Sequence, residues 1–207
     1  RGLESAFGMS VIPGTWLESI QITKGTGSVV NGYESMAGLV NLEFKKPKDM
    51  PLMSLNAYQN RFGRTELNLQ SGQRLSERWH MGLFASGAAI YGSFDHNHDG
   101  FRDQALSNTF SLLQRFSYQG PRMEAQLGLQ AYADDKIGGQ MSFSKQNPVG
   151  YGMALQSQHI SAFSKTGFFG KKPGQSLGVI ANLRNALKLA DVKLLDVFDT
   201  KRGGASL

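Results

Sequence analysis

The stretch DHNHDGFRD, residues 95–103, carries side chains that could bind a cation. Oxygen-bearing side chains alternate along it and a glycine follows them: Asp95, Asn97, Asp99 and Gly100. This is the beginning of the calcium-binding pattern D-x-[DN]-x-[DN]-G, in which carboxylate and amide oxygens surround the ion. The glutamate of the twelfth position is missing because Leu106 stands there, although Asp103 could replace it through a water molecule. The sequence therefore predicts either a calcium site or a polar turn in a long exterior loop.

Two histidines, His96 and His98, share this loop and add a second candidate chemistry. A flexible His-x-His pair can bind copper, zinc or haem iron through its imidazole nitrogens. The chain has four histidines in total, and no spacing connects the other two, His80 and His159, to this pair. Solvated surface histidines are therefore the favoured interpretation, and ligation of a metal by residues 95–99 is the alternative.

Motifs typical of enzymes are missing from the sequence. It contains no G-x-S-x-G, no H-E-x-x-H and no phosphate loop, and Gly25–Gly27 lacks the third glycine and the helix of a dinucleotide site. The carboxylate pairs Asp134/Asp135 and Asp191/Asp196 have no evident apolar pocket that would raise a pKa. The chain has no cysteine, which excludes thiol catalysis, thiolate metal sites and disulfides. We therefore expect no enzymatic activity.

The chain is basic, with a net charge of +6 and a pI near 9.6, which would suit an anionic partner such as nucleic acid. Its positive charges are nevertheless scattered. The short clusters lie beside prolines in predicted turns: Lys45, Lys46 and Lys48, then Lys171 and Lys172. A nucleic-acid interface would gather such residues on one surface, so we expect no nucleic-acid partner.

Strands are the elements predicted to position these loops. In residues 122–134 every second residue is apolar: Met123, Ala125, Leu127, Leu129, Ala131 and Ala133. Residues 108–119 alternate in the same way, and the sequence QGP between the two segments is typical of a tight turn. Such alternation indicates strands that are apolar on one face only, so the two segments are predicted to form a hairpin.

Weaker alternation extends this prediction to a set of strands. They cover residues 52–60, 65–71, 78–88, 108–119, 122–134, 158–166 and 175–183. Their lengths of roughly 8 to 12 residues match what a tilted strand needs to cross a bilayer, whereas no apolar run is long enough for a transmembrane helix. Aromatic residues are predicted near strand ends, where a membrane interface would lie: Trp79, Tyr91, Phe110, Tyr118 and Tyr132.

The connections between the predicted strands alternate in length. Residues 89–107 and 134–157 are long connections, whereas the connections near Gly120 and at residues 170–174 are short. In a meander, all long connections then leave from one end of the sheet. Outer-membrane barrels show this asymmetry, although a soluble sandwich could also show it.

The end of the sequence departs from the alternation. Apolar residues there follow helical spacing: Leu183, Leu187, Ala190, Leu194 and Phe198. Residues 185–207 are therefore predicted to be an atypical tail, either an amphipathic terminal helix or the product of a truncation or a shifted reading frame.

Residues 17–47, LESIQITKGTGSVVNGYESMAGLVNLEFKKP, resemble the C-terminal half of the plug domain of TonB-dependent outer-membrane receptors. The positions that match the family pattern are Glu18, Ile20, Ile22, Lys24, Gly25, Ser28, Gly32, Tyr33, Ala37, Gly38, Val40, Asn41 and Lys45. The usual aromatic-glycine order is inverted at Gly32–Tyr33. That order, together with DHNHDGFRD and KTGFFGKKPGQS, resembles the receptors of Bacteroidetes-type bacteria. The resemblance covers residues 1 to about 182.

The resemblance implies a mainly β fold. Residues 1–48 would be the C-terminal part of a plug, and residues 49–184 the first strands, about seven, of an antiparallel, curved and incomplete transmembrane β-barrel. A plug fills a lumen lined with polar side chains, so it needs glycine turns rather than a thick apolar core of its own. This requirement explains the many glycines between Gly25 and Gly38.

The resemblance also implies a function. Receptors of this family take up scarce ligands such as a ferric siderophore, haem, cobalamin or an oligosaccharide, which bind the exterior loops and the plug. The implied partners are outer-membrane lipid, the ligand and the TonB energy-transducing complex, whose contact segment is not in this sequence. The implied location is the outer membrane.

Two other classes of protein remain open. A soluble β-rich binding or scaffold module would cover both faces of its sheet, whereas the transporter would leave one apolar face bare. A barrel enzyme or passive adhesin would need a catalytic cluster, or would lack the plug pattern of residues 17–45.

Overall fold

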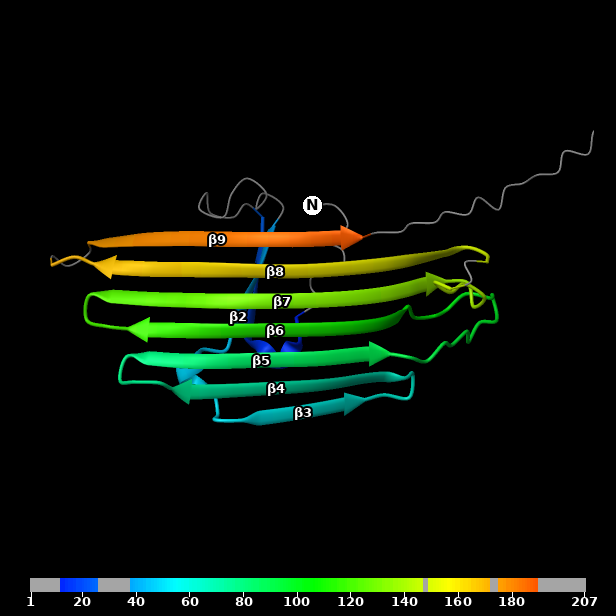
Figure 1. Ribbon diagram of the computed structural model, residues 1–207, viewed down its shortest axis with the longest axis horizontal. Helices are drawn as coiled ribbons and strands as arrows, with labels where there is room; N and C mark the ends of the chain where they lie inside the picture. The colour runs from blue at the N-terminus through cyan, green and yellow to red at the C-terminus, as the bar shows by residue number, and fades with distance from the viewer. Residues whose placement is uncertain (1–11, 26–37, 147–148, 172–174, 190–207) are drawn as a thin grey trace, which may run out of the picture.

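The computed structural model describes residues 12–25, 38–146, 149–171 and 175–189. Most of this chain is strand, arranged in two antiparallel sheets. The smaller sheet, called the N-terminal hairpin below, consists of β1 (Leu17–Lys24) and β2 (Gly38–Phe44). The larger sheet has seven strands (Figure 1): β3 (Ser54–Gln59), β4 (Arg64–Arg74), β5 (Trp79–Ile90), β6 (Leu106–Gln119), β7 (Met123–Gly139), β8 (Gly152–Phe169) and β9 (Ser176–Leu189).

The larger sheet is an open meander in which each strand pairs with its neighbours in sequence, so that β3 and β9 form the two edges (Figure 1). Two short 3-10 turns, η2 (Gly14–Trp16) and η5 (Pro47–Asp49), flank the N-terminal hairpin. In the described residues, no helix has the length and apolar character that crossing a membrane requires.

The predicted strands are confirmed, and all of them except β3 are longer than predicted. The hairpin of residues 108–119 and 122–134 is present as β6 and β7. Both β7 and β8 extend further than predicted, to Gly139 and from Gly152 respectively. Charged residues and glycines end β7, and three consecutive apolar residues, Met153, Ala154 and Leu155, stand near the start of β8. Hydrophobic alternation is therefore lost there while the backbone pairing continues.

The amphipathic helix, one of the two alternatives given for residues 185–207, is wrong as far as Leu189. Strand β9 continues to Leu189, where it pairs with Gln156 of β8. The long β8 offers a paired backbone position for every residue of β9, and this hydrogen-bonding opportunity overrides the local helical spacing. The predicted tail beyond Leu189 lies outside the described residues.

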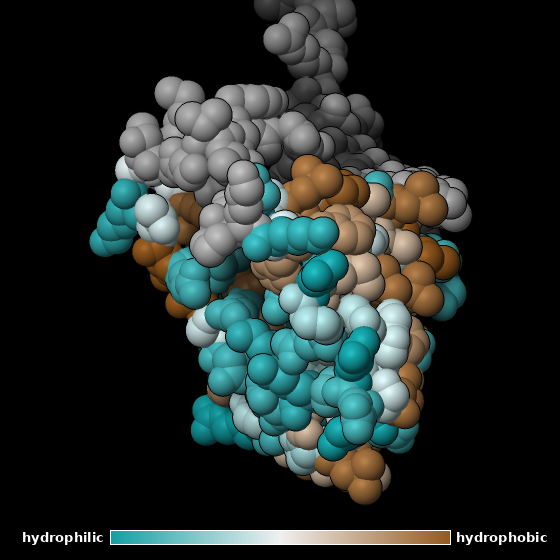
Figure 2. All heavy atoms as spheres, turned by 90° about the vertical axis from the view of Figure 1, so that its left-hand side faces the viewer, coloured by the Kyte–Doolittle hydropathy of each residue, from teal (hydrophilic) through white to brown (hydrophobic). Residues whose placement is uncertain are grey.

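One face of the larger sheet is mostly apolar. Residues that lie directly opposite each other on neighbouring strands share a face. One such row across β3 to β8 is Leu55, Leu69, Ala85, Leu112, Ala131 and Ile160. No described element covers this apolar face, and Leu55 and Ile160 are 60% and 67% exposed. Figure 2, viewed from the end with the short turns, shows hydrophobic side chains along the right-hand side, which is the face turned toward the viewer in Figure 1.

The opposite face of the larger sheet is mostly polar. A row across β4 to β8 consists of Asn68, Ser86, Ser111, Tyr132 and His159. Tyr132 therefore lies within β7 on the polar face, so the expectation that it marks a strand end is wrong, because β7 extends to Gly139. Trp79 and Tyr118 do lie at strand ends, where their rings pack 5.1 Å apart on the apolar face.

The N-terminal hairpin and its flanking turns pack on the polar face, behind the larger sheet in Figure 1. A small apolar cluster joins the two sheets: Trp16, Met50, Phe84 and Leu113, with Phe44 and Phe163 beside them. The Trp16 and Phe84 rings lie 5.5 Å apart. Burying a large apolar side chain contributes about 1.5–3 kcal/mol, so these few residues hold the hairpin against an otherwise polar surface.

Candidate functional site

The long connections of the larger sheet lie at one end, as predicted. Residues 60–63, 91–105 and 140–151 connect strands at this end, called the loop end below (Figure 1). Residues 75–78 and 120–122 make short turns at the opposite end, where β8 ends and β9 begins. The predicted cation-binding residues 95–99 therefore lie in the longest of these connections, together with other candidate ligand-contacting residues.

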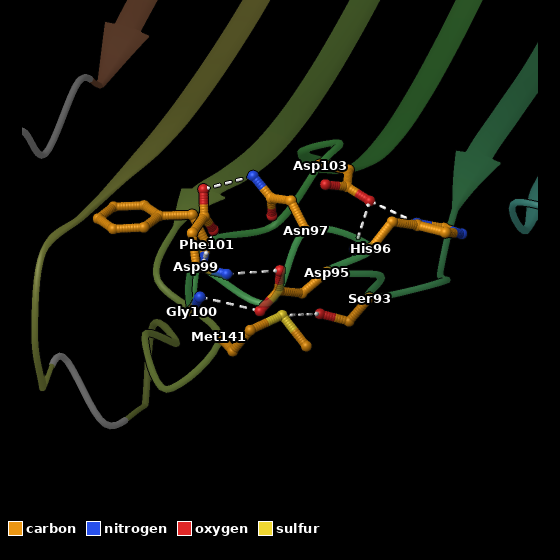
Figure 3. A network of polar contacts seen from close by, with 9 residues as sticks. All are labelled: Ser93, Asp95, His96, Asn97, Asp99, Gly100, Phe101, Asp103 and Met141. Carbon is orange, nitrogen blue, oxygen red and sulfur yellow. Dashed lines mark hydrogen bonds and ion pairs between the residues drawn. The ribbon is translucent and has the colours of Figure 1, made fainter.

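Two carboxylates give the 91–105 connection its turn. The two carboxylate oxygens of Asp95 accept hydrogen bonds from the backbone N–H groups of Asp99, at 3.1 Å, and Gly100, at 2.9 Å (Figure 3). Asp99 accepts from the Phe101 N–H and from the Asn97 side chain, both at 2.8 Å. Asp and Asn favour turns because their side chains bond nearby backbone groups in this way.

Two residues of this turn have left-handed backbone conformations. His98 has φ 58° and Gly100 has φ 83°. This region is rare for a residue with a side chain, although histidine enters it more readily than most. The carboxylate hydrogen bonds of Asp95 and Asp99 hold the turn on both sides of His98.

His96 pairs with Asp103 at the other side of the turn. Its Nδ1 lies 2.6 Å from Asp103 Oδ2, and its backbone N–H donates to the same oxygen at 3.1 Å (Figure 3). The hydrogen bond from the His96 side chain lowers the pKa of the Asp103 carboxyl. The His96 ring also packs near Phe62 and Phe94, with centroid distances of 5.7 and 5.9 Å, so this pair links the connection to the 60–63 turn.

The carboxylates of the loop make hydrogen bonds within the protein. Those of Asp95 and Asp99 accept from backbone N–H groups, and that of Asp103 is bound to His96. In the described part of the chain, no group of three or more His, Asp or Glu side chains is placed to hold a metal ion. A calcium site or a His-x-His metal site at residues 95–99 stays a prediction.

The N-terminal hairpin contains the second set of predicted site residues. Asn41 donates from its side chain to Gln21 across the β1–β2 pair at 3.1 Å. Gly38 has φ 137°, and a Cβ placed on it would lie 2.9 Å from the Thr23 carbonyl oxygen. Gly25 has φ 86°. Both glycines therefore occupy positions that a side chain would strain.

The remaining residues of the hairpin pattern lie apart from these contacts. Glu18 is exposed at an irregularity in the pairing, between Leu17 opposite Phe44 and Ser19 opposite Glu43. Lys24 is exposed at the end of β1. Gly32 lies outside the described residues. The structure thus places Glu18, Lys24, Gly25, Gly38 and Asn41 on one hairpin, and the metal-loop residues at the loop end of the other sheet.

Arg115 of β6 holds the hairpin to the polar face. Its guanidinium donates to the carbonyl oxygens of Phe44 and Lys45, at 3.4 and 3.1 Å, and to the Gln126 side chain at 3.2 Å. On β4, the side chain of Gln70 donates to the Thr15 carbonyl at 2.9 Å. Since arginine carries five donors in a rigid fork, one residue can satisfy several backbone acceptors at once.

The connector, defined as residues 45–53, sits in a depression made by two glycines of the larger sheet. A Cβ on Gly72 would lie 2.6 Å from the Met50 Cβ, and a Cβ on Gly82 would lie 3.2 Å from Met50 Sδ and from Pro47 Cγ. Any side chain at Gly72 would therefore collide with the connector. The absence of side chains at these positions lets the backbone of the connector approach the sheet closely.

A cavity of about 870 Å³ separates the hairpin from the rest of the polar face. Its walls include Asn41 and Glu43 of β2, Arg115 of β6, Gln126 and Gln130 of β7, and Lys165 of β8. Amide, carboxylate and cationic groups therefore line one part of the space beside the hairpin, and apolar side chains such as Leu42, Phe44, Leu113 and Phe163 line the rest.

No known protein-family model matches this sequence, and no solved structure matches the chain. The assignment of a function therefore rests on the fold and on the residues themselves. Sequence reasoning did not single out Arg102 and Arg115, because their partners are largely backbone carbonyls of distant segments, which leave no pattern in the side-chain sequence.

Proposed function

We propose that this chain is part of a TonB-dependent receptor of the outer membrane. In this proposal the larger sheet is part of the curved transmembrane barrel wall and the N-terminal hairpin is part of the plug. The ligand is a scarce solute such as a ferric siderophore, haem, cobalamin or an oligosaccharide. It binds at the loop end and enters when the TonB complex displaces the plug.

The contrast between the two faces of the larger sheet carries the proposal. The apolar face is bare in the described residues, whereas the polar face bears the glycine-containing hairpin. Water penalises a wide exposed apolar surface, and the hydrocarbon of a bilayer does not. A soluble β-rich module would instead cover its apolar face with a second layer. The long connections at a single end match the exterior loops of such barrels.

The two edges of the larger sheet fit the same function. Unpaired strand edges promote aggregation in water and are not tolerated in lipid. Plugged transporters of the outer membrane have about 22 strands. In the proposed receptor, β3 and β9 therefore pair with further strands of the barrel.

Cysteine labelling of neighbouring residues on β7 tests the proposed location. The chain has no cysteine, so each introduced thiol is unique within it. Leu129 lies on the apolar face and its neighbour Gln130 lines the cavity beside the hairpin. In the full receptor in outer membranes, we expect Leu129→Cys to resist a water-soluble maleimide and to react with a lipid-soluble one. Gln130→Cys is the matched control and should show the opposite preference.

The labelling result distinguishes an outer-membrane receptor from a soluble β-rich module. Equal reaction of Leu129→Cys with both reagents, in a protein recovered from the soluble fraction, would replace the receptor with the soluble module. Uptake of ferric siderophores, haem, cobalamin and oligosaccharides, measured in cells with and without TonB, then tests transport itself. Loss of uptake without TonB is expected.

A further inference from the structure

Arg102 joins the two long connections at the loop end. From the 91–105 connection, its guanidinium donates to three backbone carbonyls of the 140–151 connection: Gln140 at 2.5 Å, Met141 at 3.0 Å and Phe143 at 2.9 Å. Its Nε donates to Ser93 Oγ of its own connection at 2.9 Å. One planar cation thus fixes the course of two segments that lie about 40 residues apart along the chain.

Further contacts surround this arginine. The Met141 N–H donates to the Gly100 carbonyl at 2.8 Å, and an isolated β-bridge pairs Phe101 with Gln140. The Ser93 hydroxyl lies 3.4 Å from Met141 Sδ, which Figure 3 shows beside the Asp95 turn. The rings of Phe101 and Tyr151 lie 6.2 Å apart across the junction. The two connections therefore meet through backbone, polar and aromatic contacts.

Arg102 donates to more acceptors than any of the other residues just named at this junction. Hydrogen bonds from an ionised donor are stronger than neutral ones. Removing the guanidinium would leave three carbonyls of residues 140–143 without this donor, and only Ser93 would be affected on the other side. Loss of the guanidinium would therefore mainly weaken the contact between the 91–105 and 140–151 connections.

We propose that Arg102 is a positioning residue that makes the two long connections one preorganised surface for the ligand. Phe101 and Met141 are 38% and 39% exposed at the junction, and Tyr151 is 50% exposed. A ligand that contacts side chains from both connections needs these side chains in fixed relative positions. Preorganisation of the two connections reduces the conformational entropy that is lost on binding. The role in ligand binding rests on the proposed receptor function, whereas the coupling of the connections does not.

The distance between the connections measures this coupling directly. Gln104 and Gln146 are exposed, one in each connection, and both can be replaced by cysteine and spin-labelled in a chain that has no other cysteine. In the full protein we expect a narrow distance distribution. Arg102→Ala should broaden it, and Arg102→Lys should not restore it, because an ammonium cannot span the same acceptors. Arg61→Ala, which removes an exposed cation stacked over Phe62 at the same end, is the control and should leave it narrow.

Hydrogen exchange and a covalent rescue complete the test. Arg102→Ala should speed exchange at the Met141 amide by on the order of tenfold, while the amides of paired β6 and β7 stay protected and show that the sheet is folded. A Phe101→Cys/Gln140→Cys disulfide in the Arg102→Ala background should restore slow exchange, because an isolated antiparallel β-bridge places these two positions directly opposite each other.

The proposal is overturned if Arg102→Ala leaves both the spin-label distribution and the Met141 exchange unchanged. It is also overturned if, in Arg102→Ala, exchange rises only at the amide of position 102 and the disulfide has no effect on exchange. Neither result depends on transport, so failure here leaves the receptor function open. Failure of TonB-dependent uptake, in turn, would leave the measured coupling intact.

Discussion

At the scale of single residues, the carboxylates at the loop end that were predicted as metal ligands also hold the backbone of their own turn. Asp95 and Asp99 accept hydrogen bonds from the turn that they belong to, and Asp103 accepts from His96. The sequence indicates where these residues lie. It does not indicate their partners, because the same alternating oxygens suit a cation and a tight turn equally well.

The contact between Asp103 and His96 predicts a pH dependence for this connection. The pKa of Asp103 is lowered from its ordinary 3.8 by the hydrogen bond from His96. A lowered carboxyl pKa gives stability that is present above the ordinary value and is lost as pH falls through the lowered value. We therefore expect exchange protection of the His96 amide to persist at pH 4 and to disappear in stronger acid.

Hydrogen exchange at several pH values checks this expectation. Asp103→Asn removes the titrating group and is the control, since its loop should show no such acid transition. A transition at or above pH 4 that survives in Asp103→Asn would assign the effect to another group.

At the scale of elements, hydrophobic alternation predicts the strands well where one face is apolar and the other polar. It succeeds for β6 and β7, and it fades at the ends of β7 and β8 near the loop end. In β9 every second residue from Leu177 to Leu189 is apolar except Asn185, but the helical spacing of Leu183 and Leu187 suggested a helix instead. Pairing with β8 makes these residues a strand, and the length of β8 is not visible in the sequence of β9 itself.

The connector offers a prediction at the same scale. Gly72→Ala places a methyl group against Met50, so we expect it to lower the free energy of unfolding by about 1–3 kcal/mol, as other overpacked sites do. Gly87→Ala on β5 is the matched control, since nothing lies within 4 Å of its Cβ position.

Denaturant unfolding of both variants in detergent micelles measures the difference. An unchanged midpoint for Gly72→Ala would mean that the connector does not occupy the depression between β4 and β5. A fall for Gly87→Ala of equal size would attribute the effect to the strand backbone instead.

At the scale of the whole molecule, the apolar face determines where the protein can reside. An arginine at the bilayer midplane on the lipid side of a barrel costs about 2–4 kcal/mol. If the protein is the proposed receptor, we therefore expect Leu129→Arg to reduce the amount of folded protein in outer membranes, whereas Gln130→Arg, on the polar face, should have a small effect.

Immunoblots of purified outer membranes measure the amount of folded protein. Unheated samples are used because a folded barrel then migrates differently from the unfolded chain. Equal folded amounts for the two variants would contradict a lipid environment for the apolar face. Loss of both would indicate that β7 tolerates no bulky cation on either side.

The attachment of the hairpin to early strands has a consequence for biogenesis. Met50 packs against Gly72 and Gly82, so the loops closed by these contacts are short, and short loops lose little chain entropy on closing. In the proposed receptor, the hairpin can therefore pack against β4 and β5 before the later strands of the barrel are added.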